Sequence, residues 1–126
     1  MRGVVFDTGA LLALERGTLR MRQRFEALVA NSVVPKVPTP ILAEWWRKGR
    51  REKERMAILR SLQQEPLSPY AAKLAGVAMG VVRGATIIDA IVMAAASVRS
   101  DIVFTSDPED LERLREVFPD VLVVRV

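Results

Sequence analysis

Short runs of β-branched and apolar residues alternate with segments of helical periodicity along the whole chain. Such runs, bounded by turn residues, are typical of buried strands, and the longer periodic segments are typical of helices. A repeated strand-then-helix order predicts a parallel sheet covered by helices on both faces. The expected strands lie at 3–6, 33–37, 102–105 and 121–126, and the expected helices at 10–15, 19–30, 39–48, 50–64, 68–82, 86–98 and 107–117.

Three local features refine this pattern. Pro35 has no backbone N–H to donate, so it predicts either an edge strand or the end of a strand. Thr39-Pro40 is a good helix start, with Thr at the N-cap and Pro at the first helical position. In the charged segment 50–64, apolar residues recur at helical spacing, which predicts a helix lying on the surface.

The length and composition favour one compact domain over 1–126, since 126 residues of which 50% are hydrophobic can bury one substantial core. The longest uncharged stretches of the apolar second half, 74–82 and 90–98, fall well short of the ~20 residues that a membrane span needs. Asp7 and Glu15 interrupt the N-terminal apolar run, so no export signal is expected. We therefore expect a cytoplasmic protein.

The chain contains no cysteine and no histidine. Disulfides, thiolate nucleophiles, His-dependent triads and His-ligated zinc are therefore excluded. If the protein is an enzyme, carboxylates with a hard metal ion are the leading option. The net charge of +4 and the pI near 10.1 fit a polyanionic partner, as they also fit many ordinary soluble domains.

Four carboxylates stand where a parallel sheet would bring them together. Asp7 and Asp107 each follow an apolar strand directly, Asp89 lies in the first turn of an expected helix, and Glu44 lies about one turn into another. Ligands bind outside the carboxyl ends of the strands in such sheets. Crowded carboxylates repel one another unless a cation lies between them, and Mg²⁺ or Mn²⁺ would suit these ligands and activate water.

Each carboxylate also has a structural explanation. Asp7, Asp89 and Asp107 stand at positions where an acidic residue caps a helix or favours its first turn. Glu44 could pair with Lys48 on a solvated helix face. Taken one at a time, these explanations are the stronger ones, so the catalytic hypothesis depends on the joint arrangement of the four.

Four stretches of the sequence resemble, in order and spacing, the motifs of PIN-domain ribonucleases of the VapC toxin type. The first holds V-F-D-T-G-A-L-L-A-L, the second P-T-P-I-L-A-E, the third I-I-D-A-I-V-M-A-A-A, and the fourth V-F-T-S-D-P-E-D-L. Together they extend the resemblance over essentially the whole chain, at 5–14, 38–44, 87–96 and 103–111.

The resemblance implies a PIN-like, Rossmann-like α/β/α sandwich, for which we expect a central, mainly parallel five-stranded sheet. It implies that one or two Mg²⁺ or Mn²⁺ ions bind to the four carboxylates and that neighbouring side chains support them. It also implies an RNA substrate, a homodimer and a cognate antitoxin that covers the acidic pocket. The implied catalytic and metal-binding residues are Asp7, Glu44, Asp89 and Asp107, with Thr8 and Thr105 supporting the site and Asp110 either an outer ligand or only a first-turn helix acid.

The least typical region begins at two adjacent tryptophans. Its side chains could contact RNA phosphates, a base or a partner protein. Alternatively, one tryptophan packs in the core, its neighbour points about 100° away, and the charges form a solvated face. The residues concerned are Trp45, Trp46, Arg47, Arg50 and Arg51.

The resulting hypothesis is a metal-dependent endoribonuclease that acts as the toxin of a toxin-antitoxin pair. A receiver-type signalling domain has a similar length, but it requires a Lys after a late strand, and no Lys follows Lys73. A non-catalytic PIN-like module that binds RNA or protein remains the alternative.

Overall fold

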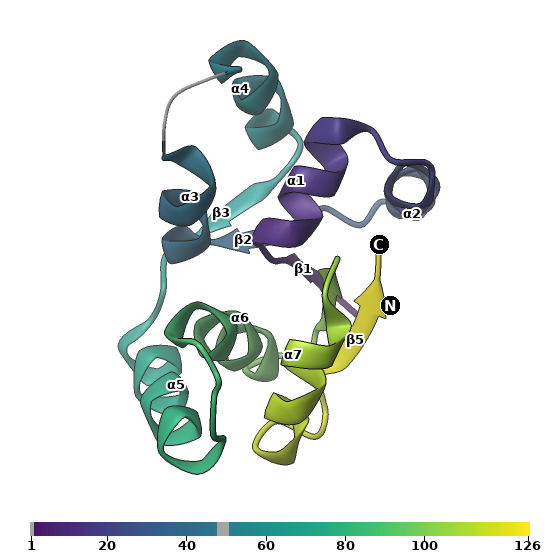
Figure 1. Cartoon of the computed structure of the whole chain (residues 1–126). Helices are drawn as coiled ribbons and strands as arrows, with labels where there is room; N and C mark the ends of the chain where they lie inside the picture. The colour runs from purple at the N-terminus through teal and green to yellow at the C-terminus, as the bar shows by residue number, and fades with distance from the viewer. Residues whose placement is uncertain (1, 48–50) are drawn as a thin grey trace.

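The computed structural model describes residues 2–47 and 51–126 and contains a five-stranded parallel sheet (Figure 1). The strand order is β3-β2-β1-β4-β5, and each pair of neighbours is parallel. The predicted α/β class and five-stranded sheet are confirmed. The strands are β1 (Val4–Phe6), β2 (Lys36–Pro38), β3 (Gln63–Glu65), β4 (Ile102–Thr105) and β5 (Leu122–Arg125).

Helices cover both faces of this sheet (Figure 1). The helix α1 packs against β1 and β4, and α2 and α4 pack against α1; α6 packs against β1, β2 and β4, and α5 lies on α6. Within the two described ranges, every helix is too short or too polar to cross a membrane. The helices are α1 (Thr8–Arg16), α2 (Leu19–Ala30), α3 (Thr39–Trp46), α4 (Glu52–Arg60), α5 (Pro69–Val81), α6 (Ile87–Ser97) and α7 (Pro108–Glu112), which continues into the 3₁₀ helix η1 (Arg113–Glu116).

The strand order reverses its direction between β1 and β4. The chain first runs outward from β1 through β2 to β3, and after α5 and α6 it returns to the other side of β1 to form β4 and β5. The loops after β1 and β4 therefore leave the sheet next to each other, with helices on opposite faces. In open parallel sheets this switch point is where ligands bind.

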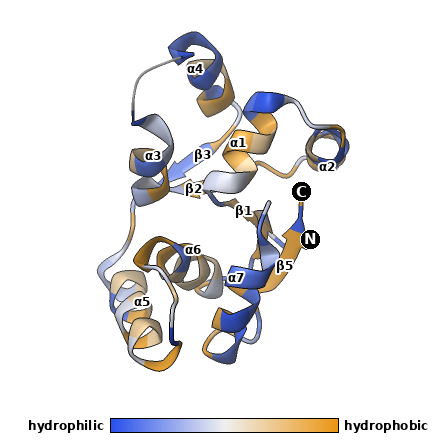
Figure 2. Ribbon diagram, in the orientation of Figure 1, coloured by the Kyte–Doolittle hydropathy of each residue, from blue (hydrophilic) through white to orange (hydrophobic). Residues whose placement is uncertain are grey.

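The segment after α4 corrects the predicted helix 50–64. The helix α4 ends at Arg60, and 63–65 form the edge strand β3, where Gln63 N donates to Pro35 O at 2.8 Å. All three residues of β3 are polar, as its blue colour in Figure 2 shows, so no apolar alternation marks the strand in the sequence. Pro35 stands directly before the internal strand β2, so it marks a strand end and not an edge.

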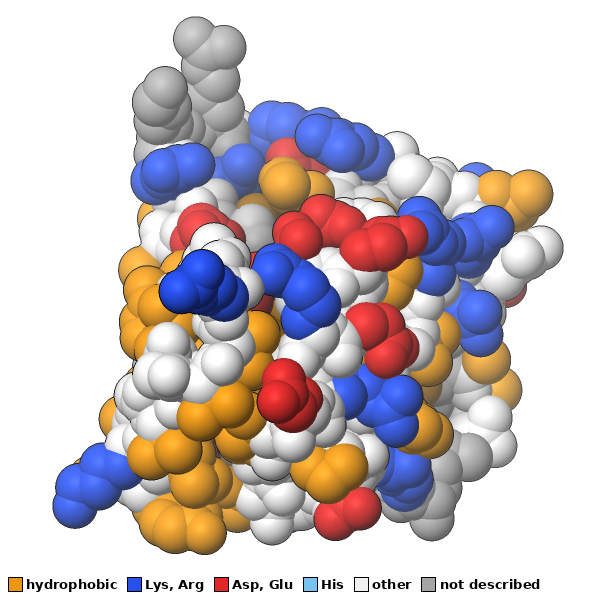
Figure 3. All heavy atoms as spheres, turned by 60° about the horizontal axis from the view of Figure 1, so that its bottom comes forward, with side chains coloured by type: hydrophobic (Ala, Val, Ile, Leu, Met, Phe, Trp, Pro, Cys, Tyr) orange, Lys and Arg blue, Asp and Glu red, His pale blue; other side chains and the backbone are white. Residues whose placement is uncertain are grey.

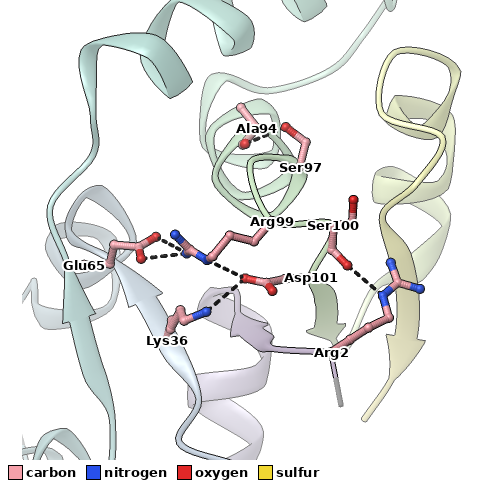
Figure 4. A network of polar contacts seen from close by, with 8 residues as sticks. All are labelled: Arg2, Lys36, Glu65, Ala94, Ser97, Arg99, Ser100 and Asp101. Atoms are coloured by element: carbon pink, nitrogen blue, oxygen red, sulfur yellow. Dashed lines mark hydrogen bonds and ion pairs between the residues drawn. The ribbon is translucent and has the colours of Figure 1, made fainter.

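An ion network around the buried Asp101 connects three strands of the sheet (Figure 4). The side chain of Asp101 is 2% exposed and lies 3.3 Å from Lys36 Nζ and 3.4 Å from Arg99 Nε. Arg99 Nη2 also donates to both carboxylate oxygens of Glu65, at 2.8 and 2.6 Å. A Cβ at Gly3 would lie 2.5 Å from Asp101 Oδ1, so only glycine permits this approach. The network therefore ties β2 and the polar β3 to β4.

We expect the substitution Asp101→Asn to lower the free energy of unfolding by about 3 kcal/mol, because it leaves Lys36 and Arg99 without their buried counter-charge. Urea denaturation at neutral pH measures this change. Glu112→Gln is the matched control, since Glu112 pairs with Arg115 at 3.3 Å on the exposed surface and should contribute less than ~1 kcal/mol. Equal effects of the two substitutions would contradict a stabilising role for the network.

Candidate metal centre

Asp7 both caps a helix and faces the candidate site. Its side chain is 9% exposed, and its Oδ1 accepts from Ala10 N at 2.8 Å as the N-cap of α1. Its own backbone N–H donates to Phe104 O at 3.3 Å, which fixes the end of β1 against β4. The capping explanation from the sequence is therefore correct, and it is compatible with a second role because one oxygen serves the cap.

Glu44 projects from α3 toward the start of α1. Its Oε1 accepts a hydrogen bond from Thr8 Oγ1, which joins the first residue of α1 to α3. Thr8 therefore holds the Glu44 carboxylate in place, as expected for a supporting residue. The alternative pair of Glu44 with Lys48 lies outside the described residues.

Asp89 lies in the first turn of α6, where its backbone N–H donates to Thr86 Oγ1 at 3.1 Å. The helix is thus capped by the hydroxyl of Thr86, which also hydrogen-bonds to the half-buried Asp89 carboxyl and lowers its pKa against the effect of burial.

Asp107 follows β4 and stands at the N-cap of α7 but makes no side-chain capping hydrogen bond. Its backbone N–H donates to Thr105 Oγ1 at 3.0 Å, so Thr105 fixes the turn that presents the exposed carboxylate. A Cβ at Gly9 would lie 3.2 Å from Ser106 N and closer still to Ser106 Oγ. Glycine at position 9 therefore lets the start of α1 approach the loop that carries Asp107.

All four predicted carboxylates line one cavity of about 170 Å³ at the switch point of the sheet. The three predicted supporting residues line it too. The sequence prediction missed Gly9, Ile88 and Ser106, although Ser106 stands between two predicted residues and was visible as a polar residue at a strand end. The predicted residues that line the cavity are Asp7, Thr8, Glu44, Asp89, Thr105, Asp107 and Asp110.

Burial and like charge both act on Asp7. The pKa of its carboxyl is raised from 3.8 to about 6, mainly by desolvation through burial. Hydrogen bonds from Thr105 and Ala10 lower the pKa, and the nearby charges of Asp89 and Glu44 add to the increase. At neutral pH the ionised Asp7 is therefore held in a place that disfavours its charge. A cation in the cavity would relieve this penalty.

The neighbouring carboxyls are perturbed in the same direction. Partial burial raises the pKa of Asp89, and the charges of Asp110 and Glu44 add to that effect. Hydrogen bonding to the side chains of Asp110 and Glu109 raises the pKa of Asp107. The perturbations connect the residues into one cluster of mutually repelling acids.

The oxygen atoms that line the cavity are suitable ligands for a hard divalent cation. Carboxylate and hydroxyl oxygens are the ligands that Mg²⁺ and Mn²⁺ prefer. As placed in the described part of the chain, however, no three acidic side chains converge closely enough to hold a metal ion between them. The side chains share one cavity without forming a closed coordination shell.

The region of the adjacent tryptophans lies away from this cavity. Trp45 is 2% exposed, its Nε1 donates to Glu15 Oε1 at 3.0 Å, and the Arg55 guanidinium lies 5.3 Å from its ring centroid. Trp45 therefore packs between α1, α3 and α4 and is not available to contact RNA. The alternative in which one tryptophan belongs to the core is correct.

The other residues of that region differ in exposure. Trp46 is partly buried and lines a shallow apolar groove with Leu42 and Met56. Arg51 lies 3.7 Å from Glu15, and Arg47 is exposed. Arg50 lies outside the described residues. A contact of this region with RNA or a partner stays a prediction.

The raised pKa of Asp7 predicts how the stability of the fold depends on pH. An acid whose folded pKa lies above its unfolded value stabilises the fold below the unfolded pKa, and this contribution is lost as pH rises through the folded pKa. In metal-free buffer the contribution of Asp7 should therefore fall between about pH 4 and pH 6. We expect Asp7→Asn to be more stable than the wild type at pH 7.5, by roughly 2 kcal/mol, and to show a flatter pH profile.

Thermal and urea unfolding from pH 3.5 to 7.5 in EDTA measure this difference. Asp120→Asn, an exposed carboxylate outside the cavity, is the control and should follow the wild-type profile. A destabilised Asp7→Asn at pH 7.5 would show that the ionised carboxylate is favoured without metal.

Comparison with known proteins finds similarity only at the level of structure. No family model matches the sequence, and no curated protein matches it. A chain of DNA-bound VapBC from Salmonella typhimurium superposes with a TM-score of 0.76 at 17% identity, over 99% of this chain and 98% of that one. A chain of VapBC2 from Rickettsia felis bound to a promoter DNA fragment gives 0.77 at 13% identity, over 98% of both chains.

A chain of a toxin-antitoxin complex from Klebsiella pneumoniae gives a TM-score of 0.75 at 18% identity, over 95% of this chain and 96% of that one. At such low identity these likenesses establish the fold. The chain therefore has the PIN-like α/β/α fold that its sequence motifs predicted, and it shares this fold, over nearly its whole length, with chains of VapBC and other toxin-antitoxin complexes.

Proposed function

We propose that this protein is a metal-dependent endoribonuclease of the VapC type and the toxin of a toxin-antitoxin pair. The observation that carries the proposal is the meeting of four carboxylates, from four separate segments of the chain, in one small cavity at the switch point of the sheet. Helix capping explains single residues but gives no reason for all four to line the same cavity. These residues are Asp7, Glu44, Asp89 and Asp107.

The charge balance of the cavity supports a bound cation. In the described part of the chain, none of these four carboxylates forms an ion pair with Lys or Arg, whereas two neighbouring acids do, Asp110 with Arg113 at 3.6 Å and Glu109 with Arg125 at 2.9 Å. Unpaired acids beside one another are costly without positive charge, and most of all Asp7, which is buried. Repulsion among acids and a raised pKa, such as that of Asp7, are typical of a metal site without its ion.

In this proposal the four carboxylates hold one or two Mg²⁺ or Mn²⁺ ions. Such an ion, when bound, activates water and stabilises the charge that develops on a phosphodiester. The chain itself supplies the positioning. Thr8 holds the Glu44 carboxylate, Thr105 holds the backbone of Asp107, and α1 holds Asp7 through its cap.

The proposal includes an antitoxin, a homodimer and a cytoplasmic location, where RNA substrates occur. The antitoxin is supported by the toxin-antitoxin complexes that share the fold. An apolar surface on α5, where Tyr70, Val77 and Val81 are more than half exposed, supports a contact between two copies. The groove beside Trp46 is a second apolar surface on which a partner segment can lie.

The second candidate is a PIN-like module that binds RNA or protein without catalysis. It is favoured by one observation, namely that no three acids of the described residues converge on a common point. The two candidates differ in whether a divalent ion binds and whether RNA is cut.

The first test is cleavage of a panel of purified tRNA, rRNA fragments and single-stranded RNA in Mg²⁺ or Mn²⁺. We expect cutting that EDTA stops and that Asp89→Asn reduces by at least about 100-fold, because loss of one ligand weakens both the binding and the alignment of the ion. Asp120→Asn makes the same chemical change at an exposed site outside the cavity and should cut at the wild-type rate. Cutting that persists in EDTA and in Asp89→Asn would count against the proposal.

Calorimetric titration with Mn²⁺ separates the two candidates. The enzyme requires binding by the wild type and by Asp120→Asn, with weaker binding by Asp89→Asn. If the heat of Mn²⁺ binding is the same for all three proteins, or if no heat of binding is detected for any of them, the non-catalytic module is favoured.

A further inference from the structure

A groove of about 480 Å³ lies between α2 and β4, separate from the acidic cavity. One wall is the face of α2 that carries Arg20 and Arg24, one helical turn apart. The floor is apolar and includes Leu28 and Phe104. Neither the carboxylate chemistry nor the apolar surfaces proposed for partners account for this groove.

The two arginines of the groove lack counter-charges. Arg20 and Arg24 are exposed, and among the described residues neither forms an ion pair or a side-chain hydrogen bond. Of the other twelve described arginines, six are paired with acids within 4 Å. The paired ones are Arg51, Arg55, Arg99, Arg113, Arg115 and Arg125.

The sequence of α2 explains this difference. The helix contains Arg20, Arg22 and Arg24 but only one acid, Glu26, and no i,i+4 acid stands on the groove side of either arginine. Uncompensated positive charge on one helix face is the electrostatic footprint of a polyanion site. Figure 3 shows one face of the molecule on which acidic side chains gather toward the middle, with Lys and Arg side chains around and between them.

The floor of the groove includes a packed aromatic side chain. Phe104 is 6% exposed and stacks on Phe6 with ring centroids 5.6 Å apart, and Phe6 in turn meets Phe25 of α2 edge-on at 6.4 Å. An apolar floor below two guanidinium groups offers a place for a base or ribose together with charges for phosphates.

The groove borders the acidic cavity through β4. Phe104 lines the groove and the next residue, Thr105, lines the cavity, while Asp7 N donates to Phe104 O at 3.3 Å. The groove and the cavity are therefore lined by consecutive residues of β4, whose side chains point to opposite faces of the sheet.

We propose that this groove binds the single-stranded RNA that the acidic cavity cuts, with Arg20 and Arg24 contacting its phosphates. The inference rests on the proposed function. An acidic cavity repels a polyanion, so the affinity for RNA must come from positive charge beside it. A single strand fits because its unstacked bases can reach an apolar floor, which the bases of a duplex cannot.

The test is binding of a fluorescently labelled 12-nucleotide single-stranded RNA of mixed sequence, followed by anisotropy in EDTA so that no cutting occurs. We expect Arg20→Gln with Arg24→Gln to weaken binding by on the order of tenfold or more at 0.1 M salt, and to reduce the slope of log K against log salt by about 1.4, since two phosphate contacts are lost. Arg20→Lys with Arg24→Lys keeps the charge and should keep the slope.

The matched control is Arg60→Gln with Arg83→Gln, which removes the same charge from two exposed arginines outside the groove. This control should bind RNA within about twofold of the wild type. If the groove variant and the control variant lose RNA affinity equally, the loss is explained by net charge alone, and the inference is overturned. A groove variant that binds as tightly as the wild type with an unchanged slope would overturn it as well.

The outcome is independent of catalysis. If Asp89→Asn stops cleavage while the Arg20→Gln, Arg24→Gln variant cuts RNA at the wild-type rate with wild-type affinity, the proposed function is supported and the groove is not the RNA-binding site. If the wild type never cuts RNA but the groove variant selectively loses RNA binding, the groove is an RNA-binding site and the nuclease proposal fails.

Discussion

The reversal of strand order between β1 and β4 is the constraint on which the rest of the structure depends. Because all five strands are parallel, every strand ends at the same edge of the sheet, and the reversal leaves the loops after β1 and β4 without a helix between them. Asp7 and Asp107, which are 100 positions apart in the sequence (107 − 7), are therefore neighbours in space. The close approach of Gly9 to Ser106 follows from the same reversal.

Helix starts at this edge combine a structural role with the proposed metal binding. Asp7 caps α1 with one oxygen, and the hydroxyl of Thr86 accepts a hydrogen bond from the backbone N–H of Asp89 as the cap of α6. A helix N-terminus also stabilises negative charge through its dipole, which offsets part of the repulsion among the acids. The structural and functional explanations of these residues are therefore complementary, and a site built on helix starts needs few residues that have no other role.

Charge is distributed differently in two clusters on the sheet. In the first, Asp101, Lys36, Arg99 and Glu65 pair with one another, so the buried charge of Asp101 is balanced and the polar strand β3 is bound to the rest of the sheet. In the second, at the carboxyl end, like charges gather without partners, and the unpaired arginines of α2 lie beyond them. Balanced charge holds the fold together, and unbalanced charge marks where a cation and a polyanion would bind.

The sequence by itself determined the α/β class, four of the strands and the identity of the cavity-lining acids, because buried strands and amphipathic helices have distinct periodicities and each acid stands at the end of a strand or near the start of a helix. The fifth strand was expected only from the family resemblance. The sequence did not determine β3, since Gln63, Gln64 and Glu65 carry no apolar alternation and pair only because Pro35 and the Arg99 network hold them at the edge. Only the tertiary structure decided that Trp45 is buried and that Arg20 and Arg24 are unpaired. Both depend on which distant side chains pack beside them, and local patterns do not encode long-range contacts.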